Sequence, residues 1–447
     1  MNDHPMFDET LPLLVSILKQ EAGPDFAQDG TIIRDASGRL AFVAARTAKD
    51  EQERESLNRA VSTKLGPYAR KEGCVRFADD PGAAAVTAEQ STLPIRVGDD
   101  FYRLLDRRIV GSGWLNEPLS KSSSPPRFVF ATLKGGVGRS TALTVAAADL
   151  ARRGRNVLVI DLDLEAPGLG DLLLNDERTP AFGVIDYLVE VGIADIRPSR
   201  LQEFIGTSPL TSAGGGRVDV MPALGKTSIT SPENVLAKLS RAMTEDVSSD
   251  GGVVSVDRQI ANMIHAVTER EQYDVVFIDS RAGLSELAAP AVLGLGATVL
   301  LFGTAQRQTV EGYRALFAAL QLLAQRDRAL GKEAEWRSAL RPVYAKSSMD
   351  EDIGQRFAED IYELYSAHIY DAEDGLETNG DAFRFLRDDP DGPHQPLVIP
   401  FNANFIDFDP ARHPSHLTSS FYEQTFRPFL DGIDKAMSTD STDKSVA

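Results

Sequence analysis

The chain has 447 residues, of which 42% are hydrophobic and 25% are charged, as in an ordinary soluble globular protein of two or three domains. Its net charge of −19 disfavours non-specific nucleic-acid binding, because such binding needs a basic face that neutralises phosphates. Cys74 is the only cysteine, which excludes an intrachain disulfide and a cysteine-based zinc or iron–sulfur site within one chain. The acidic N-terminus is not a signal peptide, and no apolar stretch suits a membrane span, so we expect a cytoplasmic protein.

Residues 1–116 are predicted to form a small α+β module. The segment TIIRDASGRLAFVAA (31–45) predicts a β-hairpin that turns at Asp35–Gly38, and DEQERESLNRAVSTKL (50–65) predicts a helix. We find no catalytic motif in this module and interpret it as an interaction or regulatory domain. Residues 117–126, EPLSKSSSPP, are crowded with serine and proline and predict a linker.

Residues 127–437 alternate short apolar segments with longer amphipathic segments. This pattern predicts an α/β domain, with a mostly parallel sheet flanked by helices on both faces. Between residues 176 and 272 the pattern loosens, and we expect several helices and one strand there. A closing helix is predicted to end at residue 437, and the small polar residues 438–447 are expected to be a disordered tail. The predicted strands are residues 127–132, 156–161, 218–224, 273–279, 297–303, 341–347 and 396–402.

The segment FVFATLKGGVGRSTAL (128–143) places a glycine-rich loop between the first of these strands and the next helix. Its glycines let the backbone curl so that successive N–H groups point at phosphate oxygens, and the helix that follows adds its positive dipole end. Ser140 offers a hydroxyl to Mg²⁺. A standard P-loop has lysine where this chain has Arg139, and this chain also carries Lys134 five residues earlier.

Three aspartates follow two further strands of the predicted sheet. Asp161 and Asp163 lie at the end of the strand 156–161, and Asp279 lies at the end of the strand 273–279. Because the carboxyl ends of parallel strands meet at one edge of a sheet, we expect these carboxylates to lie beside the glycine-rich loop. Carboxylate oxygens are hard ligands of the kind that Mg²⁺ prefers.

These elements resemble the MinD/ParA family of deviant Walker A ATPases. The family pattern KGGxGK[ST] is matched by Lys134–Ser140, with arginine in place of its second lysine. The second and third family motifs are matched by VLVIDLDLEAPGLG (157–170) and DVVFIDSRAGLSE (274–286), and the resemblance extends over residues 127–435. Some ParA-like proteins of multi-gene bacterial systems are similar in carrying KGGVGR, so the chain resembles a KGGVGR subgroup with an N-terminal extension.

The resemblance implies a dimer in which two monomers hold two ATP molecules face to face. It implies that Lys134 reaches across the interface to the other subunit's nucleotide and that Asp163 positions the attacking water. It also implies that Asp279 orients a magnesium-bound water, that Asp161 belongs to the same network, and that Arg139 replaces the usual in-chain lysine. The expected nucleotide contacts are Lys134, Gly135, Gly136, Val137, Gly138, Arg139, Ser140, Thr141 and Arg281; the expected magnesium residues are Ser140, Asp161 and Asp279; the expected catalytic residues are Lys134 and Asp163.

Arg281 and Glu165 lie in the segments that match the family's two switch regions. We expect Arg281 to contact the nucleotide or the dimer interface, and the alternative is a surface salt bridge. Glu165 is expected to help place water or magnesium, and the alternative is a solvated loop acid.

Our functional hypothesis is a switch that binds ATP, dimerises around ATP·Mg²⁺ and hydrolyses it slowly. It would control an unknown partner protein in a bacterial defence or positioning system. The alternative is a scaffold in which bound nucleotide is structural and turnover is negligible. A small-molecule ligase of the same superfamily would need a substrate pocket that the sequence does not reveal. The chain lacks the basic amphipathic C-terminal helix of MinD, so we do not expect a membrane as its partner. Its net charge of −19 disfavours a nucleic-acid partner.

Overall fold

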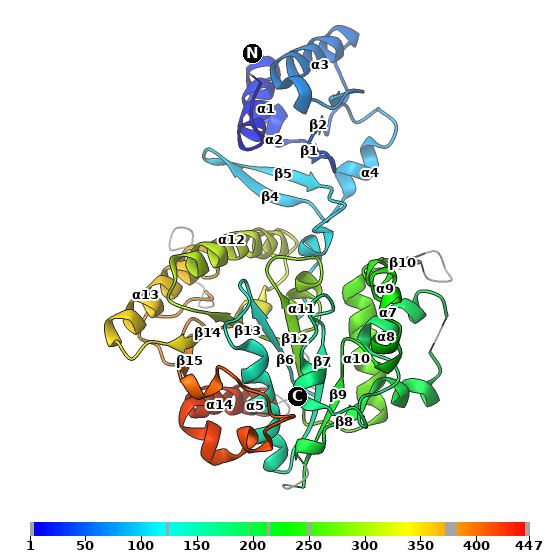
Figure 1. Ribbon diagram of the computed structural model, residues 1–447. Coiled ribbons are helices and arrows are strands. Elements are labelled where there is room, and N and C mark those ends of the chain that lie inside the picture. Colours follow the sequence, from blue (N-terminus) through cyan, green and yellow to red (C-terminus); the bar gives the residue numbers. More distant parts are fainter. Residues whose placement is uncertain are drawn as a thin grey trace. The chain divides into compact units, whose positions relative to one another are not determined.

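The computed structural model describes residues 4–121, 125–194, 196–211, 215–247, 252–371 and 382–442 (Figure 1). The chain divides into two compact units. The first unit comprises residues 1–115 and 319–334, and the second comprises residues 116–318 and 335–447. The sequence did not predict that residues 319–334 group with the first unit. No helix of the described ranges has a stretch that is long and apolar enough to cross a membrane.

The first unit is built on a five-stranded mixed sheet with the order β3-β2-β1-β5-β4. The predicted hairpin is confirmed, because β1 pairs with β2 in antiparallel register and the Gly38 N–H donates to the Asp35 carbonyl oxygen at 2.8 Å. Gly38 has a φ of +85°, which glycine adopts without strain. The predicted helix is α3, and the Asp50 carboxylate caps it by accepting a hydrogen bond from the Glu53 N–H.

Different helices of this unit cover the two faces of its sheet. On one face, Ala83 and Val86 of α4 pack with Ile33 in the small apolar cluster of the unit. On the other face, Phe26 of α2 contacts Phe42, with their ring centroids 5.2 Å apart. The elements are α1 (Phe7–Ala22), α2 (Pro24–Gln28), β1 (Thr31–Arg34), β2 (Leu40–Val43), α3 (Glu51–Leu65), β3 (Val75–Arg76), α4 (Ala83–Ala88), β4 (Leu93–Val97) and β5 (Asp100–Asp106).

The second unit contains an eight-stranded sheet with the order β15-β14-β13-β6-β12-β7-β9-β8. Every neighbouring pair is parallel except β8 and β9, which confirms the predicted mostly parallel sheet. Because β6 lies between β13 and β12, the glycine-rich loop after β6 lies at the middle of the carboxyl edge. The strands are β6 (Arg127–Thr132), β7 (Asn156–Asp161), β8 (Gly206–Thr207), β9 (Arg217–Met221), β12 (Val275–Ala282), β13 (Thr298–Gly303), β14 (Leu340–Ser347) and β15 (Leu397–Pro400), with β10 (Asp246–Val247) and β11 (Val253–Val254) in a separate pair.

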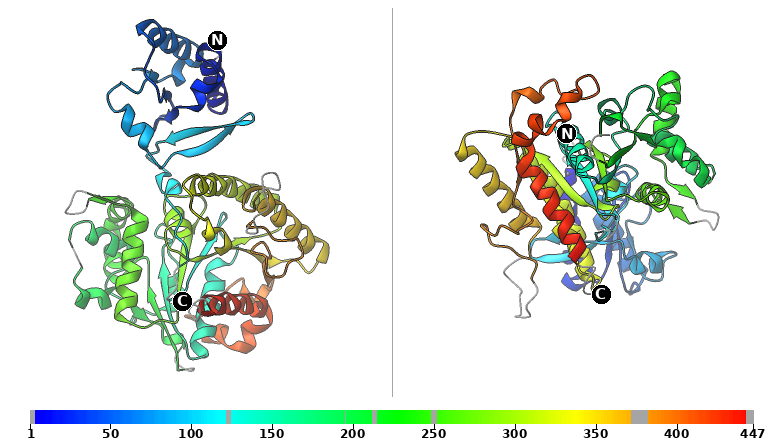
Figure 2. Two further views of the ribbon diagram at one scale, coloured as in Figure 1. Left: turned by 180° about the vertical axis from the view of Figure 1, so that it is seen from behind. Right: turned by 90° about the horizontal axis from the view of Figure 1, so that it is seen from below.

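Helices flank this sheet, as the alternating sequence pattern predicts. On one face α5 and α14 cover the strands (Figure 2). Phe429 of α14 packs against Phe130 and Phe302. Elsewhere α11 packs against β12, and Tyr313 of α12 donates to the Phe302 carbonyl oxygen at 2.6 Å. The helices are α5 (Arg139–Arg152), α6 (Leu169–Leu173), α7 (Val184–Val191), α8 (Lys226–Thr230), α9 (Val235–Ala242), α10 (Val256–Arg270), α11 (Ala288–Leu293), α12 (Arg307–Ala329), α13 (Glu351–His368) and α14 (Ser419–Thr442).

The structure differs from the sequence prediction in two further places. Between residues 176 and 272 the prediction gives one strand, whereas β8, β10 and β11 accompany β9. Each additional strand has only two residues, too few for an alternating pattern to appear. The predicted tail is also wrong in its first residues, because α14 runs to Thr442 rather than ending at 437. A helix that is already anchored by packing extends at little cost even through serine, threonine and aspartate. Residues 443–447 lie outside the described part of the chain.

Candidate functional site

The glycine-rich loop follows β6 and leads into α5. Gly136 and Gly138 have φ values of +76° and +91°, in the left-handed region where other side chains are strained. A Cβ built on Gly135 or Gly136 would meet no heavy atom within 4 Å, so the space over these residues is open. Gly138 is also the N-cap of α5, so the N–H groups of the first helical turn lie at the loop. This open backbone cradle at a helix N-terminus fits a phosphate group.

Ser140 and Asp279 meet beside this cradle. The Ser140 hydroxyl donates to Asp279 Oδ2 at 2.7 Å, because β12 is the parallel neighbour of β6 and both end at the same edge. Burial raises the pKa of Asp279, and the Arg139 guanidinium opposes that rise. The structure therefore brings together two of the three residues that the sequence assigns to magnesium.

Arg139 points into a group of carboxylates. Its side chain is only 9% exposed, and its Nη2 lies 2.9 Å from Asp163 Oδ2. The same guanidinium pairs with Asp279 and donates to the Ser280 carbonyl oxygen. We expected a phosphate contact from Arg139, and in this structure its charge is instead neutralised by two aspartates. The phosphate contact stays a prediction.

Asp163 has one oxygen that is left over from these contacts. Its Oδ1 is buried and has no hydrogen-bond partner within the described residues. A buried carboxylate oxygen without a partner marks a place for a water or an ion. The Ser140 hydroxyl and the Asp279 carboxylate are hard oxygen donors of the kind that Mg²⁺ prefers. No group of three or more His, Cys, Asp or Glu in the described ranges could hold a metal, so phosphate and water oxygens would complete the shell.

Asp161 takes part in a different set of contacts. It is fully buried, and its carboxylate accepts backbone N–H bonds from Asp163 at 3.0 Å and from Gly168 and Leu169 at 3.2 Å each. Burial raises the pKa of Asp161, and the nearby charge of Asp279 adds to the rise. Both of its oxygens are therefore used to fix the loop after β7. This geometry favours loop positioning over the predicted role in the magnesium network.

The remaining predicted residues lie nearer the surface. Lys134 is exposed, and its Nζ donates to Gln306 Oε1 at 3.2 Å. Arg281 pairs with Glu165, and their side chains are 29% and 36% exposed. The alternative interpretation of Arg281, a surface salt bridge, is therefore the contact present here, and it joins the two predicted switch segments.

Lys346 is a feature of this site that the sequence analysis missed. Among the residues described, it is the only one other than glycine with a positive φ, at +52°. The pairing of β14 with β15 shifts register between Ala345 and Ser347, and this irregularity re-aims the side chain. Lys346 Nζ donates to the Gly136 carbonyl oxygen at 2.7 Å. A β-bulge leaves no pattern in the sequence by which it could be predicted. The only available indication of this contact was a lysine near the end of a predicted strand.

A cavity of about 300 Å³ adjoins the glycine-rich loop. It was not predicted either, because its walls come from segments more than 200 residues apart in the chain. The loop and Lys346 form one side, and the segment after β15 and α14 form the other. Its lining residues are Gly136, Val137, Gly138, Thr141, Lys346, Ile399, Pro400, Phe401, Asn402, Phe405, Ile406, Thr425 and Phe426.

A comparison with models of known protein families agrees with this geometry. Residues 128–320 match the model of the CobQ/CobB/MinD/ParA nucleotide binding domain. No curated protein sequence matched significantly.

Solved structures of low sequence identity resemble the chain. The MinD cell division protein of Aquifex aeolicus is 15% identical over 70% of this chain and 97% of its own, with a TM-score of 0.41. A ParA family ATPase of Chlorobium tepidum is 13% identical over 68% of this chain and 99% of its own, with a TM-score of 0.40. Cobyrinic acid a,c-diamide synthase of Mycobacterium smegmatis, with bound ADP and magnesium, is 18% identical over 52% and 81%, with a TM-score of 0.34.

The match to the family model covers less than half of the chain and includes the glycine-rich loop and all three aspartates. The predicted fold class is confirmed by the parallel sheet and this match. Residues 128–320 are thus similar to nucleotide-binding domains of the CobQ/CobB/MinD/ParA type.

Proposed function

We propose that the second unit is an ATP-driven switch of the deviant Walker A type, in the KGGVGR subgroup. It binds ATP·Mg²⁺, dimerises around it, hydrolyses it slowly and thereby controls a partner protein. The observation that carries this proposal is the hydrogen bond between Ser140 and Asp279 beside an open glycine cradle. The match of residues 128–320 to a nucleotide binding domain supports it.

Each group at the site has a task in this proposal. The N–H groups of the loop and of the first turn of α5 bind the phosphates. When bound, Mg²⁺ neutralises charge on the β- and γ-phosphates, and Ser140 and Asp279 would hold it. The free oxygen of Asp163 would accept a hydrogen bond from the attacking water. Lys134, exposed in one chain, would supply a positive charge to the nucleotide of the other subunit.

Arg139 gives a reason for the slow hydrolysis that we propose. Its guanidinium neutralises Asp163 and Asp279, two residues that the reaction needs. Binding of ATP·Mg²⁺ brings a divalent cation that competes for the same carboxylates. A partner protein that displaces Arg139 from Asp163 would accelerate turnover.

The cavity beside the loop is the place that we propose for the nucleotide base. It is contiguous with Gly136–Gly138 and includes Phe401, a residue that is 56% exposed. An exposed aromatic ring next to a phosphate cradle can stack on a base. The lining amide of Asn402 already donates to Thr425 Oγ1 at 2.8 Å, which holds this wall in place.

A nucleotide-stabilised scaffold with negligible turnover is the second candidate. The observation that favours it is the buried pairing of Arg139 with both aspartates, because this pairing neutralises the negative charge with which Asp163 would orient a water. The two candidates differ in turnover and agree in ATP binding.

Calorimetric titration of ATP with Mg²⁺ tests the proposal. The intact chain should bind ATP, and Ser140→Ala should weaken magnesium-dependent binding about tenfold, as expected for loss of about 1.5 kcal/mol from a charge-assisted contact. Ser415→Ala is the control, because Ser415 is exposed and lies outside the cavity lining. Absence of ATP binding by the intact chain would reject both candidate functions.

A further inference from the structure

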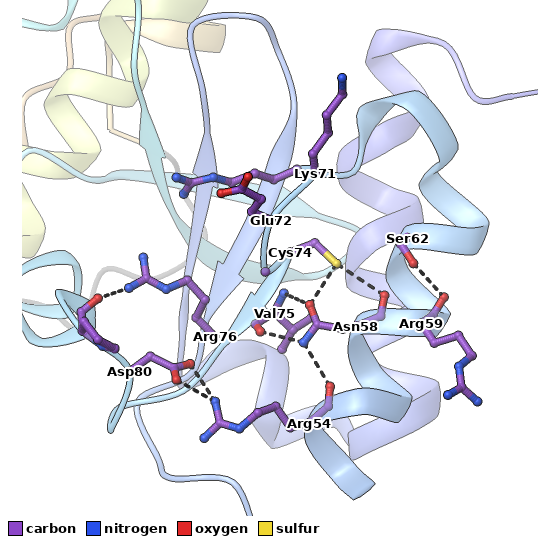
Figure 3. A pocket seen from close by; sticks show the side chains of 13 residues that line it. Arg54, Asn58, Arg59, Ser62, Lys71, Glu72, Cys74, Val75, Arg76 and Asp80 are labelled. Atoms are coloured by element: carbon purple, nitrogen blue, oxygen red, sulfur yellow. Dashed lines mark hydrogen bonds and ion pairs between the residues drawn. The ribbon is translucent and has the colours of Figure 1, made fainter. Parts of the chain in front are cut away.

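The first unit contains a second cavity, which no part of the proposed function uses. It has a volume of about 670 Å³ and lies between α3, the loop 70–74, β3 and the turn at Asp80 and Pro81. Known pockets for small ligands have volumes of roughly 300–1,000 Å³. Its lining residues are Arg54, Asn58, Arg59, Ser62, Arg70, Lys71, Glu72, Gly73, Cys74, Val75, Arg76, Asp80 and Pro81 (Figure 3).

The base of this cavity is fixed by Asn58. Its amide donates to the carbonyl oxygens of Arg54 at 3.0 Å and Val75 at 2.9 Å, and its Oδ1 accepts the Val75 N–H at 3.0 Å. The buried Cys74 thiol adds a contact to Asn58 Oδ1 at 3.3 Å (Figure 3). These contacts hold the loop against α3, so the cavity does not depend on a ligand for its shape.

One of the lining arginines is already neutralised. Arg54 lies 2.8 Å from Asp80 and 3.0 Å from Asp79, and it donates both of its terminal nitrogens to these carboxylates. Arg54 and Asp80 therefore form part of the wall and offer no net charge to a ligand.

Four other lining cations have no carboxylate partner. Arg59, Arg70 and Lys71 are exposed and form no ion pair within the described residues, and Arg76 donates only to the Pro81 carbonyl oxygen. Glu72 is the only opposing charge in the lining besides Asp80. Figure 3 shows Arg59 and Lys71 rising from different walls, on either side of Cys74, and extending outward. Long exposed side chains of this kind can turn onto a bound anion without loss of core packing.

This grouping differs from the rest of the unit. Lys19 pairs with Asp100 at 2.6 Å and Arg46 pairs with Glu53 at 2.6 Å, so most cations elsewhere have an acidic neighbour. The backbone N–H groups of residues 71–73 add further donors, because none of them is used by another described residue. Gly73 has a φ of +65°, a conformation found in backbone turns that bind anions.

We propose that this cavity binds a small molecule that carries a phosphate or diphosphate group. Arg59, Arg70, Lys71 and Arg76 supply charge-assisted hydrogen bonds, and the free N–H groups of the loop complete the contacts. Such a site would make the first unit a sensor for a phosphorylated metabolite.

The observations favour a small ligand over a nucleic acid. Residues 1–115 contain 18 acidic and 15 basic residues, whereas a nucleic-acid surface needs a continuous basic stripe. The free cations surround one concavity, and Glu72 would repel a strand that continued past it.

Calorimetric titration with pyrophosphate tests the proposal on the full chain. ADP is left out, because its diphosphate group would compete for the cavity. Pyrophosphate that binds only at the glycine-rich loop would be bound equally by the cavity variant and the control variant. The double variant Arg59→Ala/Arg70→Ala should lose at least about tenfold in affinity, since each charge-assisted contact contributes about this much. The matched control is Lys49→Ala/Arg96→Ala, which removes the same charge from exposed residues outside the cavity and should bind as the unchanged chain does.

Three outcomes would overturn the proposal. The first is no pyrophosphate binding by the unchanged chain in the millimolar range. The second is equal binding by the cavity variant and the control variant, which would place pyrophosphate elsewhere. The third is tighter binding of a short single-stranded DNA than of pyrophosphate, lost in the cavity variant, which would assign the surface to nucleic acid. Thermal unfolding of each variant shows that the first unit is folded, and binding of ADP is scored separately.

Discussion

Arginine is used in opposite ways in two regions of this molecule. At the glycine-rich loop, Arg139 is buried and neutralised by Asp163 and Asp279. At the cavity of the first unit, Arg59 and Arg70 are exposed and form no ion pair with a carboxylate of the described residues. The buried arginine is held in place by its partners, and removing either side leaves an unpaired charge in the interior. The exposed arginines are not paired with a carboxylate in this way, so their charge is available to an incoming anion.

This difference teaches how to interpret a basic residue in a site. A cation near a phosphate cradle need not bind phosphate when carboxylates within hydrogen-bond distance already neutralise it. A cation far from any motif can be the better candidate when nothing around it balances its charge. The following variants sharpen or break this comparison, beginning with the largest expected effect.

Arg139→Ala should destabilise the chain strongly. It leaves Asp163 and Asp279 buried without a positive partner, and the free energy of unfolding should fall by about 3–5 kcal/mol. Arg59→Ala, the exposed counterpart, should change it by about 0.5 kcal/mol or less. Denaturant unfolding without nucleotide measures both. Equal changes in the free energy of unfolding for the two variants would show that the pairing of Arg139 does not stabilise the fold.

Asp163→Ala should reduce ATP turnover about 100-fold while ATP affinity changes little, because a group that acts on the attacking water contributes mainly in the transition state. Steady-state phosphate release and calorimetry give the two values. Wild-type turnover in Asp163→Ala would remove the catalytic assignment.

Mixing Asp163→Ala with Lys134→Ala sharpens this test. A mixed dimer has one site with Asp163 in its own chain and Lys134 from the other, so part of the activity should return. No recovery in demonstrated mixed dimers would mean that Lys134 acts within its own chain.

Arg281→Ala should have the smallest effect if its pairing with Glu165 is its main role. Partly exposed ion pairs contribute about 0–1 kcal/mol, so thermal stability and ATP affinity should both stay close to those of the unchanged chain. The matched variant Glu165→Gln should behave in the same way. A clear loss of ATP affinity in Arg281→Ala alone would restore the nucleotide contact that the sequence suggests.

Much of the fold follows from the sequence because buried parallel strands leave continuous apolar runs. The strands β6, β7, β12 and β13 were predicted in this way. Because the carboxyl ends of parallel strands meet at one edge of a sheet, the sequence also predicted that Ser140 and Asp279 would lie close together. The direction of the Arg139 side chain could not be predicted, because a rotamer depends on the neighbours that compete for the charge. The position of Lys346, and with it the cavity beside the loop, depends on a register shift between β14 and β15. The cavity of the first unit depends on β3, which has two residues and is too short for an alternating sequence pattern. Neither feature could therefore be predicted.

The measurement that tests the central claim most directly is the molar mass of the full chain by light scattering with ATP·Mg²⁺, with ADP·Mg²⁺ and with neither. We expect ATP to double the mass seen in the other two conditions, and Lys134→Ala to bind ATP without this change, since the charge that faces the other subunit's nucleotide is lost. An unchanged mass in all three conditions, with ATP shown by calorimetry to be bound, would contradict the ATP-dependent dimer and leave the scaffold as the better description.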